Sequence, residues 1–147
     1  MAIRWGIIGC GDVARKRVAG AIQNDPNSEL VAVCRRNEKK LREFADEFRV
    51  STATTSAEEL IALPEIDAVY IATPVNLHCP QTIAAAETGK HVLVEKPMAM
   101  STAECDEMIA ACSKADVRLG VAYYRPFYPV VYRIQQLIAA GEIGTVL

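Results

Sequence analysis

The chain has 147 residues, about the length of one domain, and 51% of them are hydrophobic, which is enough for a buried core. The formal net charge is -2 and the basic residues are scattered, so we expect no nucleic-acid binding. No apolar run reaches the roughly 18 residues of a membrane span, and the five cysteines form neither a C-x-x-C motif nor a zinc-like set, so we expect no membrane segment, no metal site, and reduced thiols in a cytoplasmic protein.

The first predicted strand, residues 3–8, runs into a G-x-G-x-x-A motif and then into a helical pattern over residues 12–24. A strand, a glycine turn and a helix in this order are typical of dinucleotide binding. Gly9 would make the tight turn, Gly11 would let a pyrophosphate approach the backbone, and Ala14 would let the helix pack close to the strand. The helix N-terminus would offer N–H groups to the phosphates. The candidate cofactor-binding residues here are Gly9, Cys10, Gly11, Asp12, Val13 and Ala14. The alternative is a turn that binds nothing.

The next strand, residues 29–34, is almost continuously apolar, which suits a strand buried on both faces of a parallel sheet. Arg35 and Arg36 follow it, about twenty residues past the glycine turn, where NAD-binding sites usually place an acid for the ribose hydroxyls. Two guanidinium groups would instead attract the 2′-phosphate of NADP. The sequence therefore favours NADP, with NAD possible, and the alternative is a basic loop without a ligand.

Further strands and helices alternate along the chain. Helices are predicted over 38–48, from a capping box at Ser56 to Pro64, and over 80–88, and strands over 51–55, 66–73 and 91–94. Because ligands bind at the carboxyl ends of strands in such sheets, Thr73, Asn76 and His78 are candidates for hydrogen bonds to a cofactor. A lone histidine is more often a core or capping residue.

The last part of the chain repeats the alternation. A second capping box at Ser101 opens a helix to about Ala115, a strand follows over 117–123, and a helix begins at Pro129 and runs to 140. Residues 145–147 read as the start of another strand. About six strands alternating with helices predict an α/β fold with a doubly wound parallel sheet in three α/β/α layers. We expect the chain to be a piece of a longer protein.

Several of these segments together resemble the N-terminal part of the Gfo/Idh/MocA oxidoreductases. The resemblance rests on the glycine turn, the Asp67–His78 segment, Glu95-Lys96-Pro97, Arg125 and the Gly141–Gly144 segment. It implies an NAD(P)-binding Rossmann domain over residues 1–124. Residues 125–147 would then be the last helix and the start of an α/β substrate domain, which often carries the contacts of a homo-oligomer.

The resemblance also implies roles for individual residues. It places Gly9, Gly11 and Ala14 at the pyrophosphate and Arg35 and Arg36 at the adenosine ribose. It further implies cofactor contacts from Thr73, Pro74, Asn76 and His78 along the dinucleotide, from Glu95 and Lys96 beside the nicotinamide, and from Arg125. Lys96 is the candidate catalytic residue, acting on the substrate oxygen with a histidine from the second half of such proteins.

The implied function is hydride transfer between NADP(H) or NAD(H) and a sugar, a polyol or a related compound. The family often has an acid where Arg35 stands, and its catalytic Asp and His partners lie outside this chain, so we expect these 147 residues alone to be inactive. One alternative is a non-catalytic nucleotide-sensing domain. Another is a methyltransferase that uses S-adenosylmethionine, against which the Arg35-Arg36 pair and the Glu95-Lys96-Pro97 segment argue.

Overall fold

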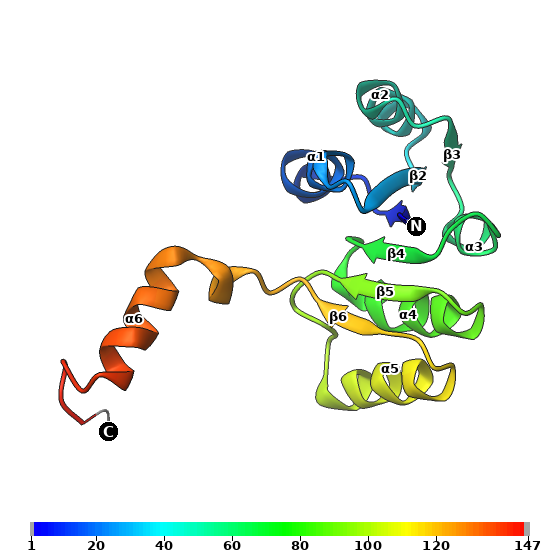
Figure 1. The fold of residues 1–147 in the computed structure, drawn as a ribbon. Coiled ribbons are helices and arrows are strands. Elements are labelled where there is room, and N and C mark those ends of the chain that lie inside the picture. Colours follow the sequence, from blue (N-terminus) through cyan, green and yellow to red (C-terminus); the bar gives the residue numbers. More distant parts are fainter. Residues whose placement is uncertain (1, 146–147) are drawn as a thin grey trace.

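The computed structural model describes residues 2–145, which form a sheet of six parallel strands in the order β3-β2-β1-β4-β5-β6 (Figure 1). The strands are β1 (Ile3–Ile8), β2 (Ser28–Cys34), β3 (Thr52–Thr54), β4 (Ala68–Ile71), β5 (His91–Val94) and β6 (Leu119–Val121). Every neighbouring pair runs parallel. The order reverses between β1 and β4, which confirms the predicted doubly wound sheet and places its switch point beside the glycine turn.

Helices cover both faces of the sheet, as Figure 1 shows. They are α1 (Ala19–Asn24), α2 (Glu38–Phe48), α3 (Ala57–Ile61), α4 (His78–Glu87), α5 (Thr102–Lys114) and α6 (Pro129–Ala139). Short helical turns precede three of them: η1 (Ala14–Val18), η2 (Val75–Leu77) and η3 (Arg125–Phe127). Helices α1 and α2 pack on one face, whereas α3, α4 and α5 pack on the other, which confirms the three layers.

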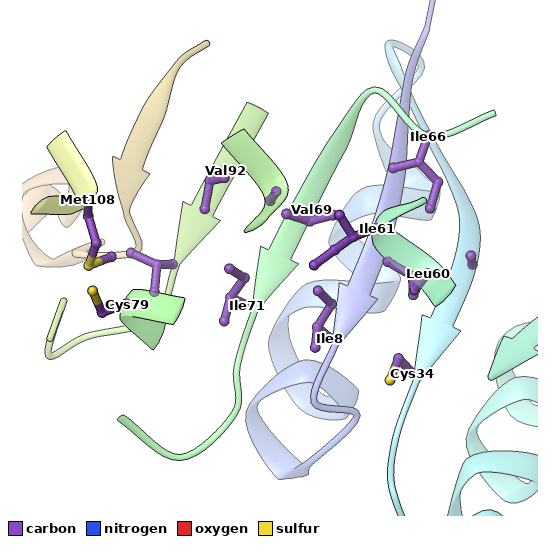
Figure 2. Packing of buried hydrophobic residues seen from close by; sticks show 13 residues of the cluster. Ile8, Cys34, Leu60, Ile61, Ile66, Val69, Ile71, Cys79, Val92 and Met108 are labelled. Atoms are coloured by element: carbon purple, nitrogen blue, oxygen red, sulfur yellow. The ribbon is translucent and has the colours of Figure 1, made fainter. Parts of the chain in front are cut away.

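Successive side chains of the central strands enter two separate cores, because residues of a strand alternate between its faces. Ile7 of β1 belongs to the core cluster that contains Phe44 of α2. Ile8 belongs to the cluster on the opposite face, which extends from Leu60 of α3 to Met108 of α5. Figure 2 shows this second cluster, with Ile8, Val69 and Ile71 pointing from neighbouring strands to the same side. Burial on both faces explains why these strands read as continuous apolar runs.

The helix after the glycine turn covers residues 12–24 as predicted, but residues 14–18 of it have π-helical hydrogen bonding. A π-turn inserts an extra residue and rotates the following side chains around the helix axis. A regular helical period through residues 12–24 therefore does not give the observed pattern of burial. Val13 is 42% exposed, whereas Ala14 and Ala19 are fully buried against the sheet.

Three helices begin at side-chain caps whose oxygens accept the backbone N–H three residues later, at 2.9, 3.1 and 3.2 Å: Asn37, Ser56 and Ser101. The two predicted capping boxes are only half formed. The Glu104 carboxylate accepts from the N–H of Met100, and the Glu59 carboxylate accepts from the Thr54 hydroxyl, so neither returns to its cap residue. The helix starts are confirmed, although the reciprocal half of each box is not.

Several boundaries differ from the predicted ones. Strands β4 and β6 are shorter than the predicted 66–73 and 117–123, and α4 begins at His78 instead of Pro80. Proline fits in the first turn of a helix, where its missing N–H has no intrahelical acceptor, so Pro80 does not mark the helix start.

Helix α6 extends away from the sheet (Figure 1). The apolar residues that helical spacing places on one of its faces are not buried: Val130, Ile134 and Ile138 are exposed. The strand predicted over residues 145–147 falls mostly outside the described residues. Within residues 2–145, no helix has the length and apolar character needed to cross a bilayer.

The amino edge of the sheet is joined by a two-pronged ion pair between β1 and the segment that leads into β4. The Arg4 guanidinium donates to both Asp67 carboxylate oxygens, at 3.0 Å from Nε and 2.6 Å from Nη2, and the Arg4 backbone N–H adds a third bond at 2.9 Å. These bonds lower the pKa of Asp67 to about 2. The fold therefore favours the ionised form of Asp67, because the carboxylate accepts the bonds from Arg4.

This shift predicts how acid destabilises the fold. An unfolded aspartate titrates near pH 3.9, so the depressed pKa contributes stability above that pH, which is lost as the pH falls from about 4 towards 2. We expect the urea midpoint of the wild-type chain to fall more between about pH 5 and pH 2 than that of Asp67→Asn. Asp106→Asn, which removes an exposed carboxyl on α5, should behave like wild type. Equal acid sensitivity of wild type and Asp67→Asn would contradict this role.

Candidate functional site

Gly9 brings the end of β1 into direct contact with the backbone that follows β4. Its φ is +98°, in the left-handed region that favours glycine, and a Cβ at this position would lie 2.5 Å from the carbonyl oxygen of Ala72. Its N–H donates to the carbonyl of Cys34 at the end of β2, at 2.9 Å. The turn therefore lies between the carboxyl ends of β2 and β4.

Gly11 has a different environment. A Cβ there would meet no atom within 4 Å, and its φ lies outside the left-handed region. Neither packing nor backbone conformation within the described chain therefore requires a glycine at this position. The open space fits the close approach of a ligand to the backbone, which is what a pyrophosphate needs at this turn.

The first helical turn provides hydrogen-bond donors beside that space. The first N–H groups of a helix have no intrahelical acceptor and carry a partial positive charge. Ala14 is fully buried, as the motif predicts, whereas Asp12 and Val13 are exposed. Cys10 is buried, and burial raises the pKa of its thiol to about 12, so it serves as an unreactive packing residue whose backbone lines the site.

A cleft of about 550 Å³ runs along the carboxyl edge of the sheet past this turn. Arg35 and Arg36 line one end of it, directly after β2. The Arg35 guanidinium donates to the carbonyl oxygen of Cys10, which fixes the side chain across the cleft. Arg36 is exposed, and no ion pair joins it to another residue within the described 2–145. Its guanidinium is available to an anion.

The loop after β4 forms the other side of the cleft. Thr73 and Pro74 line it, and the Thr73 hydroxyl donates to the Gln81 side-chain oxygen at 2.6 Å. Asn76 is exposed in η2 outside the cleft. His78 is 2% exposed, and its Nδ1 and Nε2 lie 3.0 and 2.9 Å from the carbonyl oxygens of Pro97 and Thr73. The imidazole therefore has no free nitrogen for a cofactor.

Glu95 follows β5 and is buried, with both carboxylate oxygens in hydrogen bonds. The Tyr70 hydroxyl donates to one at 2.6 Å, and the backbone N–H of Lys96 donates to the other at 3.0 Å. Burial and the neighbouring carboxylate raise the pKa of Tyr70, so its hydroxyl remains a donor. The Lys96 side chain is exposed, and the Lys96–Pro97 peptide is cis.

A second cleft, of about 660 Å³, lies on the α1 side of the sheet, and Glu95 forms part of its wall. Tyr70 and Leu93 contribute from the strands, and Tyr123 and Tyr124 from the segment after β6. The Arg17 guanidinium stacks over the Tyr124 ring at 5.5 Å. Arg125 is exposed and lines neither cleft.

The first cleft thus brings together residues from the ends of β1, β2 and β4, namely Gly9, Cys10, Gly11, Arg35, Arg36, Thr73 and Pro74. The remaining candidates lie outside its lining: Asp12, Val13, Ala14, Asn76, His78, Glu95, Lys96 and Arg125.

Sequence reasoning missed the segment Thr55–Glu58, which also lines the cleft between β3 and α3. A signal was present, because this segment directly follows a predicted strand whose carboxyl end reaches the same edge. Gln81, one turn into α4, was missed as well, and its only signal would have been an earlier helix start.

Comparison with known proteins gives relatives along nearly the whole chain. Oxidoreductase P35 of Formosa agariphila is 43% identical over 145 residues, which are 99% of this chain and 45% of that protein. The 1,5-anhydro-D-fructose reductase of Ensifer adhaerens is 38% identical over 141 residues, which are 96% of this chain and 42% of that protein. The chain therefore spans less than half the length of these curated relatives.

Solved structures share the fold. The WlbA dehydrogenase of Bordetella pertussis, in complex with NADH and UDP-GlcNAcA, superposes with a TM-score of 0.90 at 33% identity, covering 98% of this chain and 44% of that one. KijD10, a 3-ketoreductase of Actinomadura kijaniata in complex with NADP, superposes with a TM-score of 0.92 at 27% identity. The match covers 98% of this chain and 46% of that one. Nicotinamide nucleotides are thus bound by proteins with this fold.

Residues 3–123 match the family described as "Oxidoreductase family, NAD-binding Rossmann fold". The match includes the glycine turn, the cleft and the Glu95-Lys96-Pro97 segment, and it confirms the predicted resemblance. The chain belongs to the Gfo/Idh/MocA oxidoreductase family and contains its NAD(P)-binding Rossmann domain.

Proposed function

We propose that the complete protein is an NAD(P)-dependent dehydrogenase or reductase that acts on a CH–OH group of a sugar or polyol, and that these residues bind its cofactor. The observation that carries the proposal is the cleft that passes from Arg36 along Gly11 to Thr73. It combines a cationic end, which suits a 2′-phosphate, with a glycine turn that is open to a ligand and leads into a helix N-terminus, which suits a pyrophosphate. The name of the 1,5-anhydro-D-fructose reductase among the relatives supports the substrate class.

The proposed reaction transfers a hydride and a proton, and the residues of this chain would act on the proton. The nicotinamide, when bound, accepts or supplies the hydride. In the oxidation direction the carbinol carbon loses a hydride with its bonding electrons, and the hydroxyl proton passes to a base. Lys96 is the proposed proton acceptor, and Glu95 holds the Lys96 backbone through the 3.0 Å bond to its N–H. In the reduction direction the same lysine returns the proton.

We also propose a preference for NADP. Arg36 is exposed at the end of β2 with its guanidinium free for a ligand, and Arg35 is held beside it by the Cys10 carbonyl. The bound Arg35 can stack on a base or ribose while Arg36 pairs with the 2′-phosphate, because a guanidinium binds phosphate through two parallel N–H bonds.

The remaining features of the complete protein are proposals of the same kind. We assign residues 1–124 to the Rossmann domain and 125–147 to the start of a substrate domain, since α6 leaves the sheet and exposes apolar side chains. We place the protein in the cytoplasm, which is supported by its five unpaired cysteines. We further propose that the complete protein forms a homo-oligomer through its remaining domain. The exposed apolar side chains of α6 are available for contacts with that domain.

The two glycines of the turn should respond oppositely to alanine. Gly9→Ala should lower the free energy of unfolding by about 2 kcal/mol or more, because of its positive φ and the contact with Ala72. Gly11→Ala should change it by less than about 0.5 kcal/mol and yet weaken NADPH binding about tenfold or more. Urea unfolding and calorimetric titration measure both. Wild-type NADPH affinity in Gly11→Ala would remove the pyrophosphate from this turn.

Replacing Arg36 should separate the two cofactors. Arg36→Ser removes a charge-assisted bond that contributes roughly 1.5–3 kcal/mol, so NADPH affinity should fall at least about tenfold. NADH affinity should change less than about twofold. Arg42→Ser, which removes an exposed arginine paired with Glu38 on α2, is the control and should leave both unchanged. Equal losses for NADPH and NADH in Arg36→Ser would exclude the 2′-phosphate as its partner.

Substitution of Lys96 tests whether the complete protein is an enzyme or a nucleotide-sensing domain. In the complete protein, Lys96→Met should lower kcat about 100-fold or more, since a positioned proton donor or acceptor contributes roughly 10²–10⁴ to the rate. The Kd for NADPH should stay within about twofold. Lys114→Met, at the far end of α5, is the control. A complete wild-type protein that binds NADPH but oxidises or reduces no polyol or sugar would favour the sensing function.

A further inference from the structure

The His78 side chain joins two loops that belong to different strands. It is the first residue of α4, and its ring is 2% exposed. Nδ1 lies 3.0 Å from the carbonyl oxygen of Pro97, in the loop after β5, and Nε2 lies 2.9 Å from the carbonyl oxygen of Thr73, in the loop after β4. One buried ring therefore bridges the ends of two neighbouring strands.

Both bridged loops contribute to the proposed site. Thr73 lines the first cleft, and its backbone nitrogen would lie only 2.8 Å from a Cβ at Gly9, so this loop packs directly on the glycine turn. Pro97 is bonded to Lys96, the proposed proton acceptor. A continuous set of contacts thus runs from the glycine turn through Thr73 and the imidazole to the Lys96 segment.

The chemistry of the bridge requires a donor between two acceptors. Backbone carbonyls only accept, so a ring with protons on both nitrogens donates to both loops, and a neutral ring donates to one of them. A side chain without such a donor would leave both carbonyls without this partner, which is unfavourable because the buried ring position keeps water from replacing it. The ring is fully occupied by these two loops, so its role is distinct from a direct contact with the cofactor.

We propose that His78 is a positioning residue, which fixes the Glu95-Lys96-Pro97 segment relative to the loop after β4 and so shapes the nicotinamide half of the site. The proposal rests on the proposed function. The adenosine half is built from Arg35, Arg36 and residues 55–58, after β2 and β3, which the imidazole does not bond. Loss of the bridge therefore acts on one half of the dinucleotide only.

The test compares two ligands on the complete protein. NADPH reports on the whole site, and adenosine 2′,5′-bisphosphate reports on the adenosine half alone. In His78→Phe, which keeps a ring and removes both nitrogens, calorimetric titration should show NADPH affinity falling about tenfold. Affinity for adenosine 2′,5′-bisphosphate should stay within about twofold. Partial recovery of NADPH affinity is expected in His78→Gln, whose amide group can still donate.

Lys90→Met is the matched control. Lys90 is also buried, and its Nζ donates to two backbone carbonyls, those of Leu63 and Ile66, both at 2.8 Å. These bonds join the segments before β4 and β5, at the amino edge of the sheet. The variant loses a comparable pair of bonds, so it should be less stable to urea and yet bind both ligands as wild type does.

The outcomes are distinct. Equal weakening of both ligands in His78→Phe, or no weakening of either, overturns the positioning role, because the ring would then act only on overall stability. If His78→Phe does not fold, the same comparison in His78→Gln decides, with selective loss of NADPH affinity expected. Failure of wild type to bind either ligand contradicts the proposed function itself, and this inference with it.

Discussion

The contact between Gly9 and the backbone after β4 sets the geometry of the carboxyl edge. A positive φ and a carbonyl oxygen 2.5 Å from the position of a Cβ leave room for glycine alone. Because the turn is seated there, the helix that follows begins beside the switch point of the sheet, and its N-terminus faces the cleft. Two hydrogen bonds join the end of β2 to the same turn. The Gly9 N–H donates to the carbonyl of Cys34, and the Arg35 guanidinium donates to the carbonyl of Cys10.

The two edges of the sheet use similar bonds for different purposes. At the amino edge, the Arg4–Asp67 pair and the Lys90 bonds to backbone carbonyls join segments at the starts of neighbouring strands. At the carboxyl edge, His78 and Glu95 make comparable buried bonds, but they hold loops that face a cleft. Buried polar groups that are fully hydrogen-bonded fix a single arrangement, which a ligand site needs in order to be ready before the ligand arrives.

The sequence was sufficient to predict the sheet and many of the residues that line the first cleft, because both depend on local patterns. Apolar runs of strand length predicted most of the strands, the β-prone residues 51–55 predicted β3, and the cap residues Ser56 and Ser101 predicted helix starts. The π-turn at residues 14–18 could not be predicted, since it changes the helical period within a few residues and leaves no periodic signal in the sequence. The role of His78 was equally hidden, because its partners are backbone carbonyls 5 and 19 residues away, and any residue type can supply a carbonyl.

The surroundings of Lys96 show which groups of the described chain are free to act on its proposed proton transfer. Its neighbour Glu95 is the nearest carboxylate in sequence, yet that group is already bonded to the Tyr70 hydroxyl and to the Lys96 backbone. The exposed amine forms no ion pair within residues 2–145. The groups that would tune its proton affinity during a reaction must then come from the substrate, the cofactor, or the part of the family's longer proteins that this chain does not span. The proposed proton transfer therefore depends on what closes over Lys96.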